Sequence, residues 1–326
     1  MSAQTVGARA VGERLRELAA GEVHFDRSLA PLTTYRVGGA AAVLFEPASA
    51  ADLLHLRTAV RDVGADPAEL GFLALGRGSN MVVSDRGFDG IVIRTGAGLS
   101  WIRGDEQRPT RVAAGAATSL PLLANWAARR SLAGLEFTVG IPGSVGGGVR
   151  MNAGAHGGEV ADTLVSVEVF HLREWGSAQI EPAQLDLDYR HSALSDAHLV
   201  VAASFDLVAD EEHAVRSRME SYRRHRATTQ PGALQNAGST FKNPPGDAAG
   251  RLVDAAGLKG HRVGGVQVSE LHANFFIASS GATAQDVFDL VHDVRKRVLD
   301  RFGVDLEPEV RFVGPFDTAV LAEASR

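Results

Sequence analysis

The sequence predicts an α+β fold of two or three domains, and three observations lead to that prediction. The first 210 residues carry many short strand patterns and few helix patterns in mixed order, whereas a doubly wound parallel sheet alternates the two regularly. From about residue 210 onward, longer helix patterns take over. The chain has 326 residues, which is long for a single hydrophobic core, so two or three domains are expected.

The composition is that of an ordinary globular protein and argues against several classes of function. Hydrophobic residues make up 45% of the chain and charged residues 22%. Cysteine is absent, which excludes a disulfide framework and cysteine-ligated zinc and fits a reducing cytoplasm. The formal net charge of −6 argues against a bulk electrostatic grip on nucleic acid.

The N-terminal region is predicted to be a helix and not a targeting segment. No apolar run in the chain approaches the roughly 18 residues that cross a bilayer, so no membrane insertion is expected. Glu13 and Arg14 interrupt any apolar stretch near the start, which argues against a signal peptide. The apolar residues there fall at helical spacing and predict an amphipathic helix over 6–20, ended by Gly21.

The rest of the first 210 residues is predicted to contain strands, loops and two further helices. Residues 32–39 are predicted to be an extended piece that ends in a glycine pair. Ser49 and Asp52 form a capping-box pattern that opens one helix, and Ser119 opens the other. Strands are predicted over 42–45, 72–75, 81–83, 91–93, 111–114, 165–169 and 199–207.

Beyond residue 210, the first helix has an apolar face of Val215, Met219 and Tyr222 and is otherwise rich in arginine. Its ordinary interpretation is a solvated helix face, and the alternative is a surface that steers an acidic ligand. Thr283 and Asp286 are predicted to cap a long helix with a regular apolar stripe. The remaining predictions are a helix over 248–256 and strands over 270–277 and 305–313.

A glycine run over 140–158 is the most unusual stretch of the chain, with eight glycines among its 19 residues. Ordering so many glycines costs backbone entropy, and the usual gain is a close approach of the backbone to an anion such as a phosphate. A flexible linker is the alternative. The apolar residues Ile141, Val145 and Val149 speak against a linker, because they favour a buried setting.

A second glycine loop covers Gly76, Arg77, Gly78, Ser79 and Asn80. The dinucleotide fingerprint does not fit it, because a methionine follows where the third glycine belongs, and no Gly-Lys-Ser/Thr follows as in a P-loop. Its ordinary interpretation is a turn between strands. Together with the glycine run, it becomes a candidate for a second phosphate or ribityl contact.

Polar residues occur at three places where packing does not require them. Arg190 lies between two apolar strands, Ser239 follows Ala-Gly, and Glu309 lies within an apolar strand pattern. If they converged, they would suit a reaction that builds negative charge on a carboxylate or enolate, with a hydroxyl as proton donor. Each also has an ordinary role: an ion pair for Arg190, a turn cap for Ser239 and a solvent-facing position for Glu309. The histidines lack metal-ligand spacing, so no metal is expected.

These motifs, in this order, resemble the UDP-N-acetylenolpyruvoylglucosamine reductase family, also called UDP-N-acetylmuramate dehydrogenase. The resemblance covers almost the whole chain, and each motif alone is moderately specific. The motifs are Thr33-Thr34-Tyr35-Arg36-Val37-Gly38-Gly39, Leu75-Gly76-Arg77-Gly78-Ser79-Asn80, the glycine run, Tyr189-Arg190-His191-Ser192, Ala237-Gly238-Ser239-Thr240-Phe241-Lys242-Asn243-Pro244, Val268-Ser269-Glu270-Leu271-His272-Ala273-Asn274-Phe275 and Leu306-Glu307-Pro308-Glu309-Val310-Arg311-Phe312.

The resemblance implies a two-part FAD-binding domain of the vanillyl-alcohol-oxidase type, followed by an α+β substrate-binding domain. The implied boundaries are 1–100 and 101–209 for the two FAD subdomains and 210–313 for the substrate domain, with 314–326 a candidate to pack back on the first subdomain. FAD is bound noncovalently in this family, and His156 is not a convincing covalent anchor. The residues implied to bind FAD are Gly76, Arg77, Gly78, Ser79, Asn80, Gly140, Ile141, Pro142, Gly143, Ser144, Gly146, Gly147, Asn152 and Gly154.

The family's reaction has two halves, and the resemblance assigns residues to the second. NADPH first gives a hydride to the flavin, and the enolpyruvyl sugar nucleotide then takes that hydride on its vinyl carbon and a proton on the adjacent carbon. Ser239 would donate the proton, while Arg190 and Glu309 would polarise the carboxylate and stabilise the enol-like intermediate. The implied substrate contacts are Tyr189, Gln230, Lys242 and Asn243.

The resemblance also implies a biological setting: peptidoglycan precursor synthesis in the cytoplasm, hence roles in cell-wall formation, cell shape and cell division. It further implies that the protein is a monomer.

Two departures from the family pattern matter. The strand that ends at Leu207 meets the arginine-rich helix within a few residues, so the chain resembles the form of the family without a tyrosine lid. Gln230 stands where some members place a phosphate-binding lysine, and the arginine-rich helix is a candidate to compensate. The rival functions are an FAD-dependent sugar or aldonolactone oxidase and a non-catalytic nucleotide-binding protein.

Overall fold

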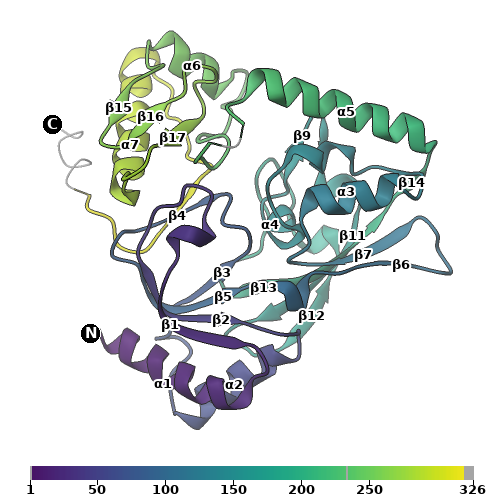
Figure 1. The fold of residues 1–326 in the computed structure, drawn as a ribbon, viewed down its shortest axis with the longest axis vertical. Coiled ribbons are helices and arrows are strands. Elements are labelled where there is room, and N and C mark those ends of the chain that lie inside the picture. Colours follow the sequence, from purple (N-terminus) through teal and green to yellow (C-terminus); the bar gives the residue numbers. More distant parts are fainter. Residues whose placement is uncertain (1, 233, 319–326) are drawn as a thin grey trace. The chain divides into compact units, whose positions relative to one another are not determined.

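The structure, a computed structural model, describes residues 2–232 and 234–318 (Figure 1). Two compact units emerge. The first combines the chain up to Arg27 with Ala42–Arg77 and Asp89–His225. The second combines Ser28–Ala41 and Gly78–Phe88 with the described chain from Arg226 onward. The implied three-part boundaries stay a prediction, and the end of the implied C-terminal return, over 319–326, lies outside the described residues.

A four-stranded sheet and two helices form one part of the first unit. The strand order is β1 (Glu22–Ser28), β2 (Ala40–Glu46), β5 (Phe88–Arg94) and β3 (Phe72–Leu75), and β3 runs parallel to β5. Helices α1 (Ala3–Leu18) and α2 (Asp52–Asp62) pack together beside it, as Figure 1 shows. Their apolar faces share a core with the strands, which includes Val11, Leu15, Phe45, Leu53, Leu56, Ile91 and Ile93.

A five-stranded antiparallel sheet forms the other part of the first unit, in the order β12 (Ser177–Ile180), β11 (Leu164–His171), β13 (His198–Asp206), β7 (Arg111–Gly115) and β6 (Ile102–Gly104). Helices α3 (Leu120–Ala128) and α4 (Val145–Arg150) share a hydrophobic core with it. Val167 and Val169 of β11 are buried, which confirms the predicted half-buried strand. The first unit also contains the short strand pairs β8 (Leu132–Ala133) with β14 (Val208–Ala209) and β9 (Gly154–Ala155) with β10 (Gly158–Glu159). Its 3-10 helices are η2 (Ala97–Leu99), η3 (Glu136–Gly140), η4 (Val160–Asp162) and η5 (Pro182–Gln184), whereas η1 (Ala30–Leu32) belongs to the second unit.

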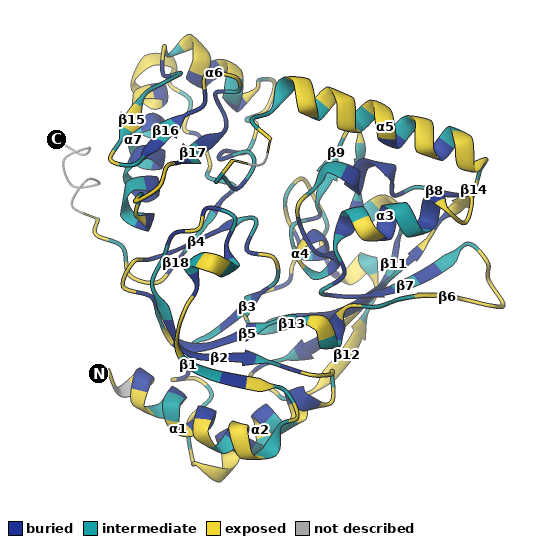
Figure 2. Ribbon diagram, in the orientation of Figure 1, coloured by how far each residue is buried: buried dark blue, intermediate teal, exposed yellow. Residues whose placement is uncertain are grey.

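The arginine-rich helix is α5 (Glu212–Thr229). Val215 and Met219 are buried against Ala124, Ala128 and Val139, which confirms the predicted apolar face. Most of its other residues are exposed, as the yellow of α5 in Figure 2 shows. Within 2–232 and 234–318, no helix combines the length and the apolar character that crossing a membrane requires.

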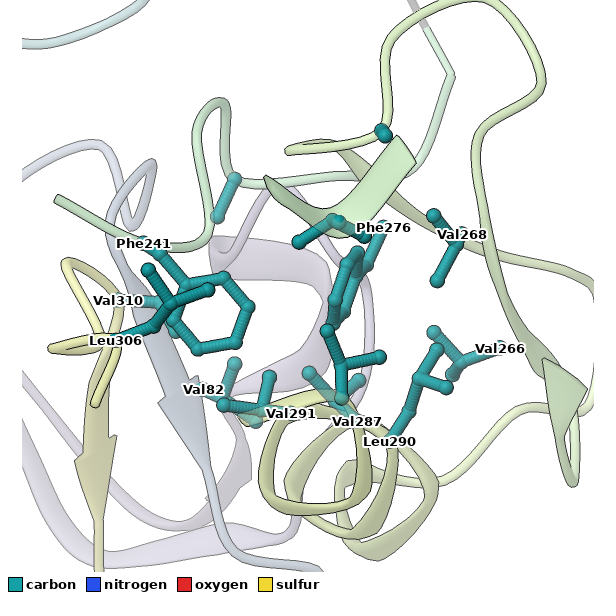
Figure 3. Close-up of a cluster of buried hydrophobic side chains, with 14 of the residues drawn as sticks. Val82, Phe241, Val266, Val268, Phe276, Val287, Leu290, Val291, Leu306 and Val310 are labelled. Atoms are coloured by element: carbon teal, nitrogen blue, oxygen red, sulfur yellow. The ribbon is translucent and has the colours of Figure 1, made fainter. Parts of the chain in front are cut away.

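The second unit is built around α7 (Ala284–Phe302), α6 (Ala249–Ala255) and the sheet of β15 (Arg262–Val263), β16 (Val266–Val268) and β17 (Phe276–Ala278). Strand β4 (Met81–Val83) joins it by running parallel to β18 (Arg311–Val313). Figure 3 shows the shared core. The predicted capping box of Thr283 and Asp286 forms, and all five residues of the predicted stripe are buried: Val287, Leu290, Val291, Val294 and Val298.

Two predictions in the first 62 residues were wrong. Residues 32–39 do not form one extended piece, because Leu32 ends the 3-10 helix η1 (Ala30–Leu32) and the chain turns at Arg36, which has a positive φ of 56° and whose N–H donates to the Thr33 hydroxyl. The Ser49 side chain caps nothing at the start of α2. The carboxylate of Asp52 instead accepts from the backbone N–H groups of Ala20 and Ala48, which ties the helix to its flanking loops.

The two predicted C-terminal strands are mostly irregular. Of the strand predicted over 270–277, only residues from Phe276 are in β17, because the Ser269 hydroxyl accepts from the N–H groups of Leu271 and His272 and bends the chain. Of the strand predicted over 305–313, only β18 forms a ladder. Pro308 has no N–H to donate, and it makes an isolated bridge with Phe241.

Candidate active site

The glycine run is hydrogen-bonded to the turn that follows strand β7 in the first unit. The N–H of Val145 donates to the Thr118 carbonyl at 2.8 Å, and that of Gly146 donates to the Ala116 carbonyl at 2.9 Å. A Cβ on Gly146 would lie only 3.0 Å from the Cβ of Ala116, so this glycine permits a close approach within the protein. These contacts exclude the linker interpretation.

The two glycine loops meet in the first unit, although 65 residues separate them. The Arg77 Nε donates to the Pro142 carbonyl at 3.3 Å. A Cβ on Gly76 would lie 2.7 Å from the Ser144 hydroxyl oxygen. Apart from Arg77, the groups that meet are backbone and small side chains, which fits a cofactor pyrophosphate bound by peptide N–H groups. The residues present therefore fit the FAD contact that the sequence predicts.

The second loop continues into the second unit. Gly78 has a positive φ of 60°, and a Cβ there would lie 2.2 Å from the Leu32 carbonyl oxygen, so the position requires glycine for packing. The Asn80 side chain donates to the Glu309 carbonyl at 3.0 Å, and the Asn80 carbonyl accepts from the Arg311 N–H. Sequence reasoning missed this second role, because an asparagine in a glycine loop carries no sign of a partner 229 positions away.

Arg190 lies against the glycine run. It occupies a tight turn closed by reciprocal backbone bonds between Asp188 and His191, with a positive φ of 56°. Its guanidinium donates to the Gly154 carbonyl at 2.9 Å and lies 5.0 Å from the centre of the exposed Tyr189 ring. The arginine is thus attached to the predicted cofactor loop.

Asn152 strengthens this connection between the glycine run and the turn. It is fully buried and has a positive φ of 38°. Its side-chain NH₂ donates to the Asp188 carbonyl at 3.1 Å, while its side-chain oxygen accepts from the Ala161 N–H at 2.9 Å. Its side-chain amide therefore positions the Arg190 turn, and its predicted cofactor contact stays a prediction.

Ser239 and Glu309 belong to neighbouring segments of the second unit. We call residues 239–242 the donor segment and residues 307–310 the carboxylate segment. The Glu309 N–H donates to the Thr240 carbonyl at 2.8 Å, and the Lys242 N–H donates to the Glu307 carbonyl at 2.9 Å. Ser239 and Glu309 are both half-buried. The structure thus brings together two of the three predicted catalytic residues, and the convergence of Arg190 with them stays a prediction.

The predicted substrate residues near Ser239 already have partners within the protein. The Lys242 ammonium lies 2.7 Å from the Glu307 carboxylate. The Asn243 side-chain oxygen accepts from the Ala249 N–H at 3.0 Å, at the start of α6. Gln230 follows the last turn of α5, where its N–H donates to the Arg226 carbonyl. Substrate contacts by these residues stay predictions.

Two titratable side chains near the donor segment have displaced pKa values. Tyr35 is fully buried, and burial raises the pKa of its phenol, although the Thr240 hydroxyl and the Ala237 backbone oppose that shift. Tyr35 therefore stays protonated beside the residue that follows Ser239. Burial also lowers the pKa of His272, whose Nδ1 accepts from the Asn274 N–H.

Arginine side chains near the start of the arginine-rich helix form ion pairs with nearby carboxylates. Arg216 pairs with Glu212 at 2.6 Å, and Arg218 pairs with both Glu136 and Asp210. These contacts favour the solvated-face interpretation for the start of the helix. Arg226 differs: it is half-buried, burial lowers the pKa of its guanidinium, and within the described chain it forms no ion pair.

An aromatic cluster that sequence reasoning missed joins α5 to the glycine run. The His156 ring stacks on the Tyr222 ring with their centres 4.2 Å apart, and His225 meets His156 edge-on at 5.6 Å. His156 lies in the left-handed region, with a positive φ of 55°. The helical spacing of Tyr222 and His225 shows that they share a face of α5, but it does not predict that His156 contacts them.

Two family models match the chain. One, described as an FAD binding domain, matches residues 41–173. The other, described as the C-terminal domain of UDP-N-acetylenolpyruvoylglucosamine reductase, matches residues 230–313. The first model covers both glycine loops and the second covers Ser239 and Glu309.

Individual proteins are similar over most of the chain. UDP-N-acetylenolpyruvoylglucosamine reductase of Nitrobacter hamburgensis is 43% identical over 297 residues, which span 90% of this chain and 93% of that protein. The reductase of Rubrobacter xylanophilus is 42% identical over 292 residues, spanning 89% and 95%. The crystal structure of the Thermus caldophilus reductase matches with a TM-score of 0.75 and 36% identity, covering 90% of this chain and 99% of that chain.

Proposed function

The chain belongs to the UDP-N-acetylenolpyruvoylglucosamine reductase family, and on that basis we propose that it reduces UDP-N-acetylglucosamine enolpyruvate to UDP-N-acetylmuramate with NADPH as reductant. It is an FAD-dependent oxidoreductase. The observation that carries the proposal is the hydrogen bond from the Glu309 N–H to the residue that follows Ser239, because it holds a hydroxyl and a carboxylate on neighbouring segments. The relatives are reductases, which removes support from the oxidase and the non-catalytic alternatives.

The proposed residues act on the enolpyruvyl group. FAD, held where the two glycine loops meet at Gly76 and Ser144, would supply the hydride that the vinyl carbon receives, with NADPH as its source. The adjacent carbon then needs a proton, which Ser239 donates and recovers from solvent. Arg190 binds the substrate carboxylate as a fixed two-pronged donor, and Glu309 together with Arg190 stabilises the enol-like intermediate. One hydride and one proton thus add across the carbon–carbon double bond.

The remaining assignments follow from the loops and the family. The meeting surface of Gly76 and Ser144 is proposed to hold the FAD pyrophosphate, since a side chain at Gly76 would disturb it. Tyr189, Gln230, Lys242 and Asn243 are proposed to contact the sugar nucleotide. The product is a precursor of peptidoglycan, so the proposed setting is cell-wall synthesis in the cytoplasm, with consequences for cell shape and cell division. The protein is proposed to act as a monomer.

A stepwise anaerobic assay tests the proposal. The purified protein is expected to be yellow, to bleach with NADPH, and to regain its colour when the enolpyruvyl sugar nucleotide is added without oxygen. Ser239→Ala is expected to bleach normally but to lose most of the recolouring, because only the second half-reaction needs the proton. A colourless protein that FAD cannot reconstitute would contradict the function, and equal losses in both halves would contradict Ser239 as the donor.

A further inference from the structure

Asn274 is a buried polar residue next to the donor segment. Its side chain is almost wholly shielded, with 3% of the residue exposed. The side-chain oxygen accepts from the Phe241 N–H at 2.9 Å, and the side-chain NH₂ donates to the Phe241 carbonyl at 2.8 Å. One side chain therefore satisfies both backbone groups of Phe241, as a neighbouring strand would.

The backbone around Asn274 adds further bonds to the donor segment. The Asn274 carbonyl accepts from the Thr240 N–H at 2.7 Å, and Ser239 forms a bridge with Phe275. On its other side, the donor segment is bonded to the carboxylate segment, through Thr240 to Glu309 and through Phe241 to Pro308. The donor segment is thus the middle one of three, with Asn274 on one side and Glu309 on the other.

The Phe241 side chain anchors the donor segment in the core of the second unit, but it leaves the orientation of the backbone to other contacts. The Phe241 ring is buried in the core of the second unit with Val82, Leu306 and Val310, as Figure 3 shows. The ring fixes one end of the residue, but it does not fix the rotation of the peptide groups on either side. The two bonds from Asn274 hold these peptide groups from one side, while the bonds between the Thr240 carbonyl and the Glu309 N–H and between the Lys242 N–H and the Glu307 carbonyl hold them from the other. Ser239 lies two residues before Phe241.

On this basis we propose that Asn274 is a positioning residue for the reaction: it holds the donor segment in the register that places the Ser239 hydroxyl relative to Glu309. The proposal rests on the proposed function. Proton transfer to carbon requires a donor fixed within hydrogen-bond reach of its target, and a displacement of about 1 Å can cost on the order of a hundredfold in rate. The first half-reaction needs no proton from Ser239, so Asn274 should affect the second half selectively.

Asn274→Asp tests the proposal with the least change of shape, because it removes the NH₂ donor. Each half-reaction of the FAD-loaded protein is followed by anaerobic rapid mixing. Bleaching by NADPH is expected to stay within about twofold of the wild type, whereas recolouring by the enolpyruvyl sugar nucleotide is expected to slow by at least about tenfold. The solvent deuterium isotope effect on recolouring is expected to rise, because a misplaced donor makes proton transfer more limiting.

Gln267→Glu is the matched control. It also converts an amide to a carboxylate in the second unit, where Gln267 donates to the Gly260 carbonyl and accepts from Arg262. It is expected to leave both half-reactions within about twofold, even where it lowers the melting temperature. Hydrogen exchange adds a readout apart from activity: exchange at the Phe241 amide is expected to accelerate in Asn274→Asp and not in Gln267→Glu.

The outcomes separate the two proposals. If Asn274→Asp recolours at the wild-type rate, or if both its half-reactions slow equally, the positioning role is overturned. If the wild type itself fails to recolour, the proposed function fails, while the exchange measurement still tests the bonds from Asn274. Should Asn274→Asp not fold, Asn274→Ser replaces it, with the same selective loss expected.

Discussion

At the scale of single residues, an ion pair with Glu307 holds the Lys242 ammonium in the second unit. The ammonium is 2.7 Å from the Glu307 carboxylate, and the lysine side chain is 21% exposed whereas that of Glu307 is 69% exposed. An exposed ion pair is weak, because water and salt screen it. If Lys242 contacts the sugar nucleotide as proposed, the diphosphate has to compete with Glu307 only through this weak ion pair.

Glu307→Gln is accordingly expected to lower the KM for the sugar nucleotide by about two- to fivefold, because an exposed carboxylate no longer competes for Lys242. Bleaching by NADPH should not change. Asp254→Asn is the control, since it removes the carboxylate from the Lys259 ion pair, also 2.7 Å long and in the same unit. Steady-state kinetics measures both, and an unchanged KM in Glu307→Gln would show that Lys242 does not contact the nucleotide.

At the scale of elements, α7 organises the second unit through its N-terminus. Thr283 and Asp286 exchange hydrogen bonds at 3.0 Å, and Asp286 also accepts from the Gly265 N–H. The Asp85 carboxylate accepts from the N–H groups of Ala284 and Gln285, at 2.9 Å each. Side chains from two segments, 283–286 and the loop at Asp85, thus satisfy the free N–H groups of the first turn, which explains why 78–88 folds with the C-terminal part of the chain.

Thr283→Ala is expected to lower the free energy of unfolding by about 1 kcal/mol, since it removes one half of the capping box. Ser49→Ala is the control. The same sequence pattern occurs there, but the exposed Ser49 side chain caps nothing, so the change should stay within about 0.5 kcal/mol. Urea denaturation measures both, and equal effects would mean that the pattern and not the bonds sets the stability.

How far the sequence predicts the elements depends on where their hydrogen bonds go. Helix α7 and strand β13 were predicted correctly, because regular burial repeats at the helix or strand period. Residues 270–275 also have strand-like composition, yet the Ser269 hydroxyl captures the backbone N–H groups that a ladder would use. Such competition depends on the side chain's position in space, which periodicity does not record.

The candidate site was predicted in part for the same reason. The motifs identified Ser239 and Glu309, and the structure places their segments side by side. The residues that hold these segments, Asn80 and Asn274, were not identified as such. The side chain of each asparagine bonds to the backbone of a segment that is remote in sequence. Because every residue type has such backbone groups, the bond does not require any particular residue at the partner position. No sequence pattern follows from such a bond.

At the scale of the whole molecule, three partly buried histidines set how stability responds to mild acid. Burial is the main cause that lowers the pKa of each: His198 in the first unit, and His272 and His292 in the second. His171 and Arg150 add to the shift of His198 through their charge. The folded protein therefore binds protons at these sites less readily than the unfolded chain does.

The free energy of unfolding is consequently expected to fall as the pH is lowered from 7.5 to 5.5. The unfolded chain gains protons first, near its histidine pKa of about 6.5, so stability is complete above that pH and declines below it. Carboxylates with lowered pKa values, such as Asp305, lose their contribution only at lower pH. Asp289 acts in the opposite sense, because burial raises the pKa of its carboxyl. The folded protein therefore binds this proton more readily than the unfolded chain does, and the resulting gain in stability begins at a pH above the ordinary aspartate pKa.

His292→Gln separates this mechanism from a general effect of acid. The His292 Nδ1 lies 2.8 Å from the Phe288 carbonyl, a bond that a glutamine NH₂ can replace without titrating. Unfolding by urea at a series of pH values is expected to show a smaller loss between 7.5 and 5.5 in the variant than in the wild type. A loss of the same size in both would mean that His292 takes up its proton equally well in the folded and the unfolded chain, and the acid response would then lie with other groups.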